Sequence, residues 1–160
     1  GDASRNIWLY DTFAGISEPS KEDVQAFDGT DAIGKWQRED QGEINQWNYT
    51  PLEIVEQNLL STNLPSNRLS FIKGPVEETI PDEIPDKISI LRLDMDWYSP
   101  TYHALVHLFP RLADNGVLKI DDYGWWQGCK KACDRYFEET ASAVMLNRID
   151  VGARVMVKTS

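Results

Sequence analysis

The chain has 160 residues, and 16 lysines and arginines against 26 aspartates and glutamates give it a formal net charge of −10. This length suits a single domain spanning residues 1–160, and 41% hydrophobic residues are typical of a globular protein rather than a disordered one. The negative charge argues against nucleic acid or an anionic membrane as a partner, because either would need a basic surface. The sequence contains no membrane-spanning stretch, no signal peptide and too few cysteines for a disulfide framework, so we expect a cytoplasmic domain.

Short apolar runs rich in β-forming residues predict the strands. Four of them lie at residues 7–10, 69–72, 88–93 and 117–120. Two more runs, at 145–149 and 153–157, flank the turn Asp150-Val151-Gly152 and predict a hairpin. Because nearly continuous apolar strands are typical of a sheet buried on both faces, we predict a mostly parallel sheet that ends in an antiparallel hairpin.

Helical patterns fall between these runs. The sequence Thr50-Pro51-Leu52-Glu53 matches a capping box with proline at the first helical position, so we expect a helix to begin there. Further helices are predicted from about Thr101 to Leu112 and from about Cys129 to Thr140. The polar stretch from Ser17 to Asn48 has no clear period and is interpreted as a long loop or lid. Strands that alternate with helices indicate an α/β fold.

Aspartates follow two successive predicted strands. Asp94 and Asp96 come after the third strand, and Asp121 and Asp122 come after the fourth. Ligands of open α/β sheets bind at the carboxyl ends of the strands, and four carboxylates gathered there would repel one another unless a cation lay among them. Oxygen ligands alone favour a hard ion such as Mg²⁺. The pattern therefore indicates a metal site; the alternative is that these aspartates cap helices and form turns.

Other candidate residues carry weaker signals. His103 and His107 have a spacing that can bind zinc, but no third ligand is evident. Cys129 and Cys133 share a helical face and are expected to be buried thiols. Three tryptophans near the acidic positions could stack on a substrate or cover the edge of the sheet: Trp97, Trp125 and Trp126.

Two segments together resemble the macrocin O-methyltransferase family. They are Leu93-Asp94-Met95-Asp96-Trp97-Tyr98-Ser99-Pro100-Thr101 and Asp121-Asp122-Tyr123-Gly124. Upstream, the segments 10–16 and 71–74 are similar to the end of one family strand with its loop and to the end of the next strand. The resemblance implies a Rossmann-like class I methyltransferase sheet. It also implies a metal-dependent enzyme that uses S-adenosylmethionine to methylate sugar hydroxyls, with a sugar or polyol as its small-molecule acceptor.

The resemblance assigns roles to individual residues. Asp94, Asp121 and Asp122 match the Mg²⁺ ligands of the family, and Asp96 matches its proposed general base. Asp11 matches the acidic group that holds the ribose hydroxyls of the cofactor. The remaining residues implied at the cofactor are Thr12, Phe13, Lys73 and Gly74.

The chain departs from the family in its first strand. No two of its ten glycines form the G-x-G of the expected glycine-rich turn, so we expect a truncated domain with the first strand missing. The strands that end at Asp11 and Asp94 then each lack a neighbour, and we expect a homo-oligomer rather than direct pairing of these two strands. Two alternative functions stay open, namely a non-catalytic binding fragment derived from a methyltransferase and an Asp-x-Asp metal-dependent glycosyltransferase.

Overall fold

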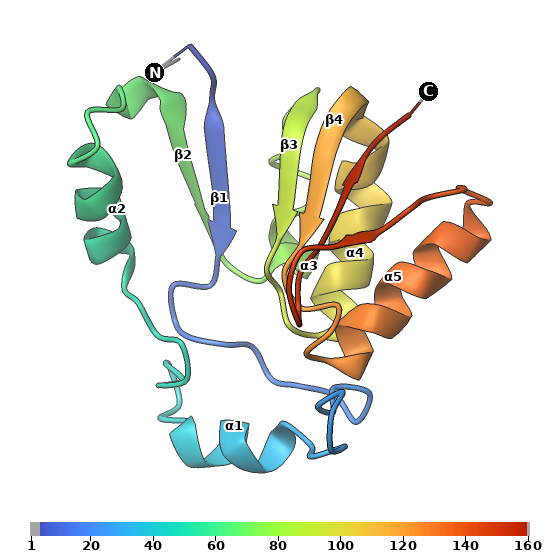
Figure 1. The fold of residues 1–160 in the computed structure, drawn as a ribbon. Helices are drawn as coiled ribbons and strands as arrows, with labels where there is room; N and C mark the ends of the chain where they lie inside the picture. Colours follow the sequence, from blue (N-terminus) through green and yellow to red (C-terminus); the bar gives the residue numbers. More distant parts are fainter. Residues whose placement is uncertain (1–3, 160) are drawn as a thin grey trace.

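The computed structural model describes residues 4–159, and within them the strands form two separate sheets (Figure 1). The smaller sheet consists of β1 (Ile7–Asp11) and β2 (Leu69–Lys73). These strands pair in parallel, with Ile7 opposite Leu69 and Asp11 opposite Lys73. Both strands are rich in β-branched and aromatic residues, which favour a pleated, half-buried surface.

The larger sheet has the strand order β3-β4-β6-β5. Its strands are β3 (Ile88–Leu93), β4 (Leu112–Ile120), β5 (Asn147–Arg148) and β6 (Arg154–Val157). β3 and β4 are parallel, whereas β6 runs antiparallel to both β4 and β5. The structure thus confirms an α/β fold with parallel strands and an antiparallel C-terminal hairpin.

Five α-helices connect the strands of the described residues. They are α1 (Ile33–Glu39), α2 (Leu52–Leu60), α3 (Val76–Thr79), α4 (Tyr98–Leu108) and α5 (Gln127–Glu139). Two short 3₁₀ helices, Ser66–Arg68 and Phe109–Arg111, precede β2 and β4. Each of these helices is too short or too polar to cross a bilayer.

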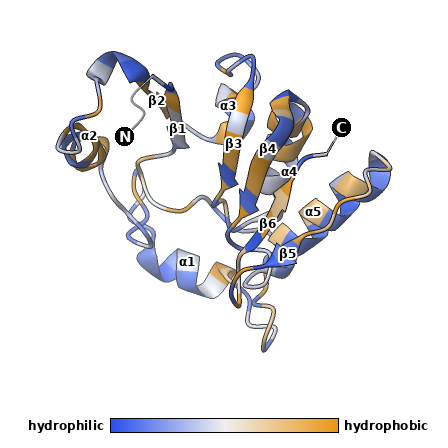
Figure 2. Ribbon diagram, turned by 45° about the horizontal axis from the view of Figure 1, so that its top comes forward, coloured by the Kyte–Doolittle hydropathy of each residue, from blue (hydrophilic) through white to orange (hydrophobic). Residues whose placement is uncertain are grey.

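The main core lies between the larger sheet and the helices α4 and α5. Leu91 and Leu93 of β3 and Leu118 and Ile120 of β4 are buried in one cluster with apolar residues of both helices. α5 is amphipathic, and Figure 2 shows apolar residues along one of its sides and hydrophilic residues along the other. The opposite face of the sheet is open, because Ile90 of β3 is 72% exposed.

Two helix boundaries differ from the predicted ones. Pro51 is the N-cap rather than the first helical residue of α2, and no side chain caps that helix, so the predicted capping box is wrong. α4 begins at Tyr98 because Pro100 fits the first helical turn, where its missing N–H leaves no hydrogen bond unmade. It ends at Leu108, four residues before the predicted end, because the chain tightens into a 3₁₀ turn around Pro110.

A cleft of about 1490 Å³ separates the two sheets and is lined by residues of both β1 and β3. The two strands point in the same direction, so their carboxyl ends lie on the same side of the molecule (Figure 1). In the described part of the chain β1 and β3 are not paired, and a hydrogen bond from Arg5 Nη1 to Ser89 Oγ (3.0 Å) joins the two sides of the cleft. Direct pairing of these strands therefore does not occur in this structure.

Candidate active site

The loops after β3 and β4 bring the predicted aspartates to one edge of the larger sheet. Leu93 and Ile120 are register partners at the ends of the two parallel strands. The Asp121 N–H donates to the Leu93 carbonyl at 2.9 Å, which ties the two loops together. We call Asp94, Asp96, Asp121 and Asp122 the acidic cluster, and their proximity confirms that the two strands are neighbours.

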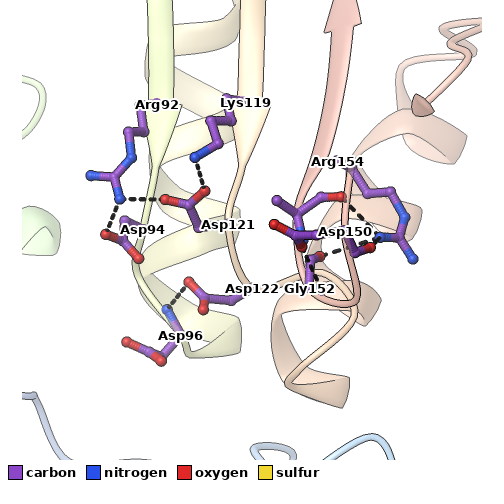
Figure 3. A network of polar contacts seen from close by, with 10 residues as sticks. Arg92, Asp94, Asp96, Lys119, Asp121, Asp122, Asp150, Gly152 and Arg154 are labelled. Carbon is purple, nitrogen blue, oxygen red and sulfur yellow. Dashed lines mark hydrogen bonds and ion pairs between the residues drawn. The ribbon is translucent and has the colours of Figure 1, made fainter. Parts of the chain in front are cut away.

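Two basic side chains from the strands hold half of this cluster (Figure 3). Arg92 Nη2 contacts Asp94 Oδ2 at 2.6 Å and also forms an ion pair with Asp121. Lys119 Nζ lies 2.5 Å from the other oxygen of Asp121. Arg92 and Lys119 are register partners on β3 and β4, so their side chains reach the same strand ends from the same face. Asp94 and Asp121 are therefore neutralised by residues of this chain.

Asp122 is buried and Asp96 is half-buried, and neither contacts Arg92 or Lys119, although the charge of Lys35 acts on Asp96. The Asp96 N–H donates to Asp122 Oδ2 at 3.2 Å, and Asp96 Oδ1 accepts a hydrogen bond from the Trp126 indole N–H at 2.9 Å. Burial, followed by repulsion from Asp94, raises the pKa of Asp96 to about 6. Burial, followed by repulsion from Asp96 and Asp94, raises the pKa of Asp122 to about 7.

Asp96 also has a backbone conformation that is rare for a residue with a side chain. Its φ is +54°, in the left-handed region, which costs about 1–3 kcal/mol and persists where surrounding contacts enforce it. The hydrogen bonds to Asp122 and from Trp126 supply such contacts, so the Asp96 carboxylate is held in a defined position.

The fit of a metal ion can be tested on these positions. Four carboxylates are the oxygen donors that Mg²⁺ prefers. Within residues 4–159, however, no three His, Cys, Asp or Glu side chains are arranged to hold a metal ion. Asp94 and Asp121 instead face Arg92 and Lys119. The acidic cluster as arranged here does not fit Mg²⁺, and the magnesium site stays a prediction.

Most of the residues expected at the cofactor line the cleft. Asp11 ends β1, Thr12 and Phe13 follow it, and Gly74 follows β2; all four border the cleft together with Asp94 and Asp96 of the acidic cluster. Asp11 Oδ1 accepts the Phe13 N–H at 2.6 Å, and the Asp11 carbonyl accepts the Gly74 N–H at 3.0 Å. Lys73 ends β2 with an exposed side chain and does not border the cleft. The cleft and its Asp11 turn therefore fit a cofactor with hydroxyl groups.

The predicted lid, residues 17–48, contains α1 and packs against the tryptophans next to the acidic cluster. Its Trp47 packs edge-on against Trp97 and Trp126, with ring centroids 5.6 and 6.0 Å apart. The Trp97 indole N–H donates to the Ser17 carbonyl at 2.8 Å. Lys35 Nζ lies 3.9 Å from the centre of the Trp47 ring. Trp97 and Trp126 thus cover the sheet edge, and no sequence pattern indicates that Trp47 joins them.

Asp23 anchors the lid and was missed in the sequence. It is 1% exposed, and its Oδ1 accepts the N–H of Tyr98, the first residue of α4, at 2.8 Å. Its Oδ2 accepts both the N–H and the hydroxyl of Ser20, at 2.7 and 2.8 Å. The only sequence signal is Ser20-x-x-Asp23, a common turn pattern that does not indicate a contact 75 residues away.

The remaining candidates have structural roles. His103 Nε2 lies 3.0 Å from the Ile80 carbonyl, and its ring contacts that of His107 with centroids 4.5 Å apart. No third ligand accompanies this pair in the described residues. Cys129 and Cys133 are buried and not joined by a disulfide, as predicted.

The architecture is that of a class I methyltransferase. The structure of the O-methyltransferase NovP matches 98% of this chain and 61% of its own, with a TM-score of 0.82 and 26% identity. The calicheamicin methyltransferase CalS11 matches 99% of this chain and 62% of its own, with a TM-score of 0.71 and 18% identity, which supports the fold alone.

The sequence places the chain within this class. A family model described as Macrocin-O-methyltransferase (TylF) matches residues 1–158, so the chain belongs to this family. One relative is 32% identical over 85% of this chain and 48% of its own. It is the 8-demethyl-8-(2,3-dimethoxy-alpha-L-rhamnosyl)-tetracenomycin-C 4'-O-methyltransferase from Streptomyces olivaceus. The demethyldecarbamoylnovobiocin O-methyltransferase of Streptomyces niveus is 30% identical over 82% of this chain and 47% of its own.

The chain spans about half the length of the curated relatives it matches. A third relative, mycinamicin III 3''-O-methyltransferase from Micromonospora griseorubida, is 28% identical and shows the same proportion, with 49% of its length covered. The family match favours a methyltransferase over the alternative of a glycosyltransferase.

Proposed function

We propose that this domain belongs to an enzyme that transfers a methyl group from S-adenosylmethionine to a hydroxyl of a sugar or similar polyol, with Asp96 as the general base. One observation carries the proposal. Asp96 is a half-buried carboxylate with φ +54°, and it borders the same cleft as the Asp11 turn. A base and a cofactor-binding turn on one cleft are what methyl transfer between two bound molecules requires.

Asp96 is suited to take a proton from an acceptor hydroxyl. A sugar hydroxyl is a poor nucleophile until its proton leaves, and the cofactor supplies the electrophilic methyl group when it is bound. Trp126 holds Asp96 Oδ1, which leaves Oδ2 available for the hydroxyl proton. A pKa raised to about 6 keeps Asp96 ionised at neutral pH while making it a stronger base than an exposed carboxylate.

Asp11 would hold the ribose hydroxyls of the cofactor, as the family resemblance implies. It lies at the carboxyl end of β1, where ligands of open α/β sheets bind. Its Oδ1 accepts a hydrogen bond from the Phe13 N–H, and its other carboxylate oxygen can accept a hydrogen bond from a ribose hydroxyl. Thr12, Phe13 and Gly74 shape the same wall of the cleft. Lys73, which is exposed and next to Gly74, would also belong to the cofactor site, as the family resemblance implies.

We also propose that the methyl transfer depends on magnesium. Asp94, Asp121 and Asp122 would be the ligands, and Asp94 and Asp121 would have to leave Arg92 and Lys119 to serve as such. The family resemblance and the oxygen-rich donor set support this assignment.

Cofactor binding and turnover can be tested separately. Calorimetric titration with S-adenosylmethionine should show binding to the wild type and at least a roughly tenfold loss in Asp11→Asn. Asp28→Asn, at an exposed carboxylate of the lid, is the matched control and should bind as the wild type does. In a radiolabel assay with a panel of deoxysugar acceptors, Asp96→Asn should lower the rate by about 10²–10⁴ without changing cofactor binding.

A non-catalytic binding fragment is the second candidate function, and it rests on the same cleft. It predicts cofactor binding without methyl transfer to any acceptor in the panel. Binding that is the same in Asp11→Asn and in the wild type would contradict both functions as stated here.

Assembly and location complete the proposal. β1 and β3 have apolar edges facing the cleft, and exposed strand edges favour pairing with another chain, which supports a homo-oligomer. Light scattering at low micromolar concentration should then give a mass above 18.3 kDa, and a stable monomer would refute this part. The two thiols, buried and not in a disulfide, support a cytoplasmic location.

A further inference from the structure

Two aromatic side chains are exposed beside the proposed active site. Phe27 of the lid is 57% exposed, and Trp125, in the loop between β4 and α5, is 43% exposed. Every other Phe, Trp and Tyr in the part of the chain that the structure describes is buried or half-buried. Single exposed apolar side chains are common on protein surfaces, but these two are in contact, with ring centroids 4.9 Å apart and planes at 88°.

Both rings are held in place by the backbone around them. The Ala26 N–H donates to the Trp125 carbonyl at 2.8 Å, which lays the lid along the loop and brings Phe27 next to Trp125. The Trp125 indole packs directly on Gly152, where an added Cβ would lie 2.0 Å from the ring. The two rings therefore form a corner whose shape is set before any ligand binds, which lowers the entropy cost of binding.

This corner adjoins the side chain that holds the proposed base. Trp126, the next residue along the chain, is buried and donates its indole N–H to Asp96 Oδ1 at 2.9 Å. The added Cβ at Gly152 would also lie 2.8 Å from the Asp121 carbonyl oxygen, so Gly152 contacts both the Trp125 ring and the end of β4. The exposed rings are thus continuous with the edge of the sheet at which Asp96 lies.

We propose that Phe27 and Trp125 form a platform for an aromatic aglycone, the non-sugar part of a glycoside, so that the acceptor is a sugar attached to a flat ring system. The inference rests on the proposed function, because it takes the sugar hydroxyl at Asp96 from it. Two rings at a right angle offer a flat group one face to stack on and a second ring to meet edge-on, the two arrangements that aromatic pairs prefer. A stable protein interface involves roughly 20–30 residues a side, so a platform of two side chains suits a small molecule better than a protein.

The test compares two glycosides that share a sugar and differ in the aglycone, p-nitrophenyl α-L-rhamnoside and methyl α-L-rhamnoside. Calorimetry measures the Kd of each with the full chain, and saturation-transfer NMR reports which ligand protons contact the protein. The wild type should bind the nitrophenyl glycoside at least about fivefold more tightly, with transfer to its aryl protons. Trp125→Leu should abolish this preference and Phe27→Leu should reduce it, because each keeps an apolar side chain but removes a ring.

Two further variants serve as controls. Trp125→Phe restores a ring and should recover part of the preference. Ile54→Ala removes an exposed apolar side chain from α2, which lies on the far side of the smaller sheet (Figure 1), and should bind both glycosides as the wild type does. Circular dichroism melting and limited proteolysis verify that each variant is folded and that its lid is in place.

Each outcome supports or overturns the platform. Equal affinity of the wild type for the two glycosides, or a preference that survives both leucine variants, would overturn it and leave the proposed function standing. A preference that is lost only in a variant whose lid is cut early would show a packing role and also overturn it. If the wild type binds neither glycoside, the platform is refuted, and titration with S-adenosylmethionine and the acceptor panel decide the proposed function separately.

Discussion

Removing the Asp23 carboxylate should release the lid from α4. Asp23→Ala deletes three hydrogen bonds, of which the two from Ser20 can be replaced by water because Ser20 is exposed. The bond from the Tyr98 N–H cannot be replaced as easily, and a hydrogen bond to a charged group is worth about 1.5–3 kcal/mol. Loss of a negative charge at the N-terminus of α4 adds about 0.5–1 kcal/mol. We expect the free energy of unfolding to fall by about 2–4 kcal/mol.

Urea unfolding followed by tryptophan fluorescence measures this change, and limited proteolysis reports whether the lid is cut first. Asp28→Ala is the matched control, because Asp28 lies in the same segment, is exposed and accepts one local hydrogen bond from Thr30. It should cost less than about 1 kcal/mol. If Asp23→Ala unfolds within about 0.5 kcal/mol of the wild type and the lid stays protected, Asp23 does not anchor the lid.

Three further predictions concern the buried carboxylates and one turn. Burial raises the pKa of Asp122 to about 7, so its protonation favours the folded state, and stability should fall as the pH rises from about 4 to about 7. In Asp122→Asn the decrease in the free energy of unfolding over this pH range should be smaller by about 2–4 kcal/mol, measured by urea unfolding at several pH values. Trp126→Phe removes the N–H that lowers the pKa of Asp96, so carbon-13 NMR titration should find that pKa higher still. Gly15→Ala should destabilise the fold by at least about 1–3 kcal/mol in thermal melts, because Gly15 has φ +88° and its Cβ would lie 1.8 Å from the Asn45 carbonyl oxygen.

The sequence predicted the strands better than the helices, for a physical reason. The strand at Ile88–Leu93 matches its prediction residue for residue, because a run of β-branched and apolar residues bounded by polar ones has few other ways to be buried. The capping box at Thr50 failed because the Pro51 backbone is extended, with ψ 150°, and takes the N-cap position itself. Helix ends depend on such single dihedral angles, which residue types only bias.

The acidic cluster shows where sequence reasoning about the site stops. The carboxyl ends of neighbouring parallel strands must meet, so the placing of Asp94 and Asp121 at one edge followed from the strand pattern. The ion-pair partners of these carboxylates could not be predicted from the sequence, because they depend on the strand register that sets Arg92 opposite Lys119. If one of the two strands shifted by one residue, its basic side chain would turn to the buried face and the pair would be lost.

The lid shows the same limit over a longer distance. Its polar composition predicted a surface segment, but the contacts that order it join residues far apart in the chain, such as Asp23 with Tyr98 and Ser17 with Trp97. Each of these contacts uses a single side chain and leaves no periodic pattern in the sequence. The conformation of a loop that is ordered by isolated polar contacts is therefore visible in the structure but cannot be predicted from the sequence.

These contacts make the lid part of the proposed active site. The Asp11 turn belongs to the smaller sheet and Asp96 to the larger one, and in the described residues β1 and β3 are not paired. The lid joins the two parts, because it continues directly from the Asp11 turn and is anchored on the larger sheet's helix α4 through Asp23. Trp126 then contacts both the lid, through its pairing with Gln25, and the Asp96 carboxylate. A lid that came loose would free Asp11 from Asp96, so loss of the Asp23 anchor should weaken catalysis even though Asp23 touches neither the cofactor residues nor the base.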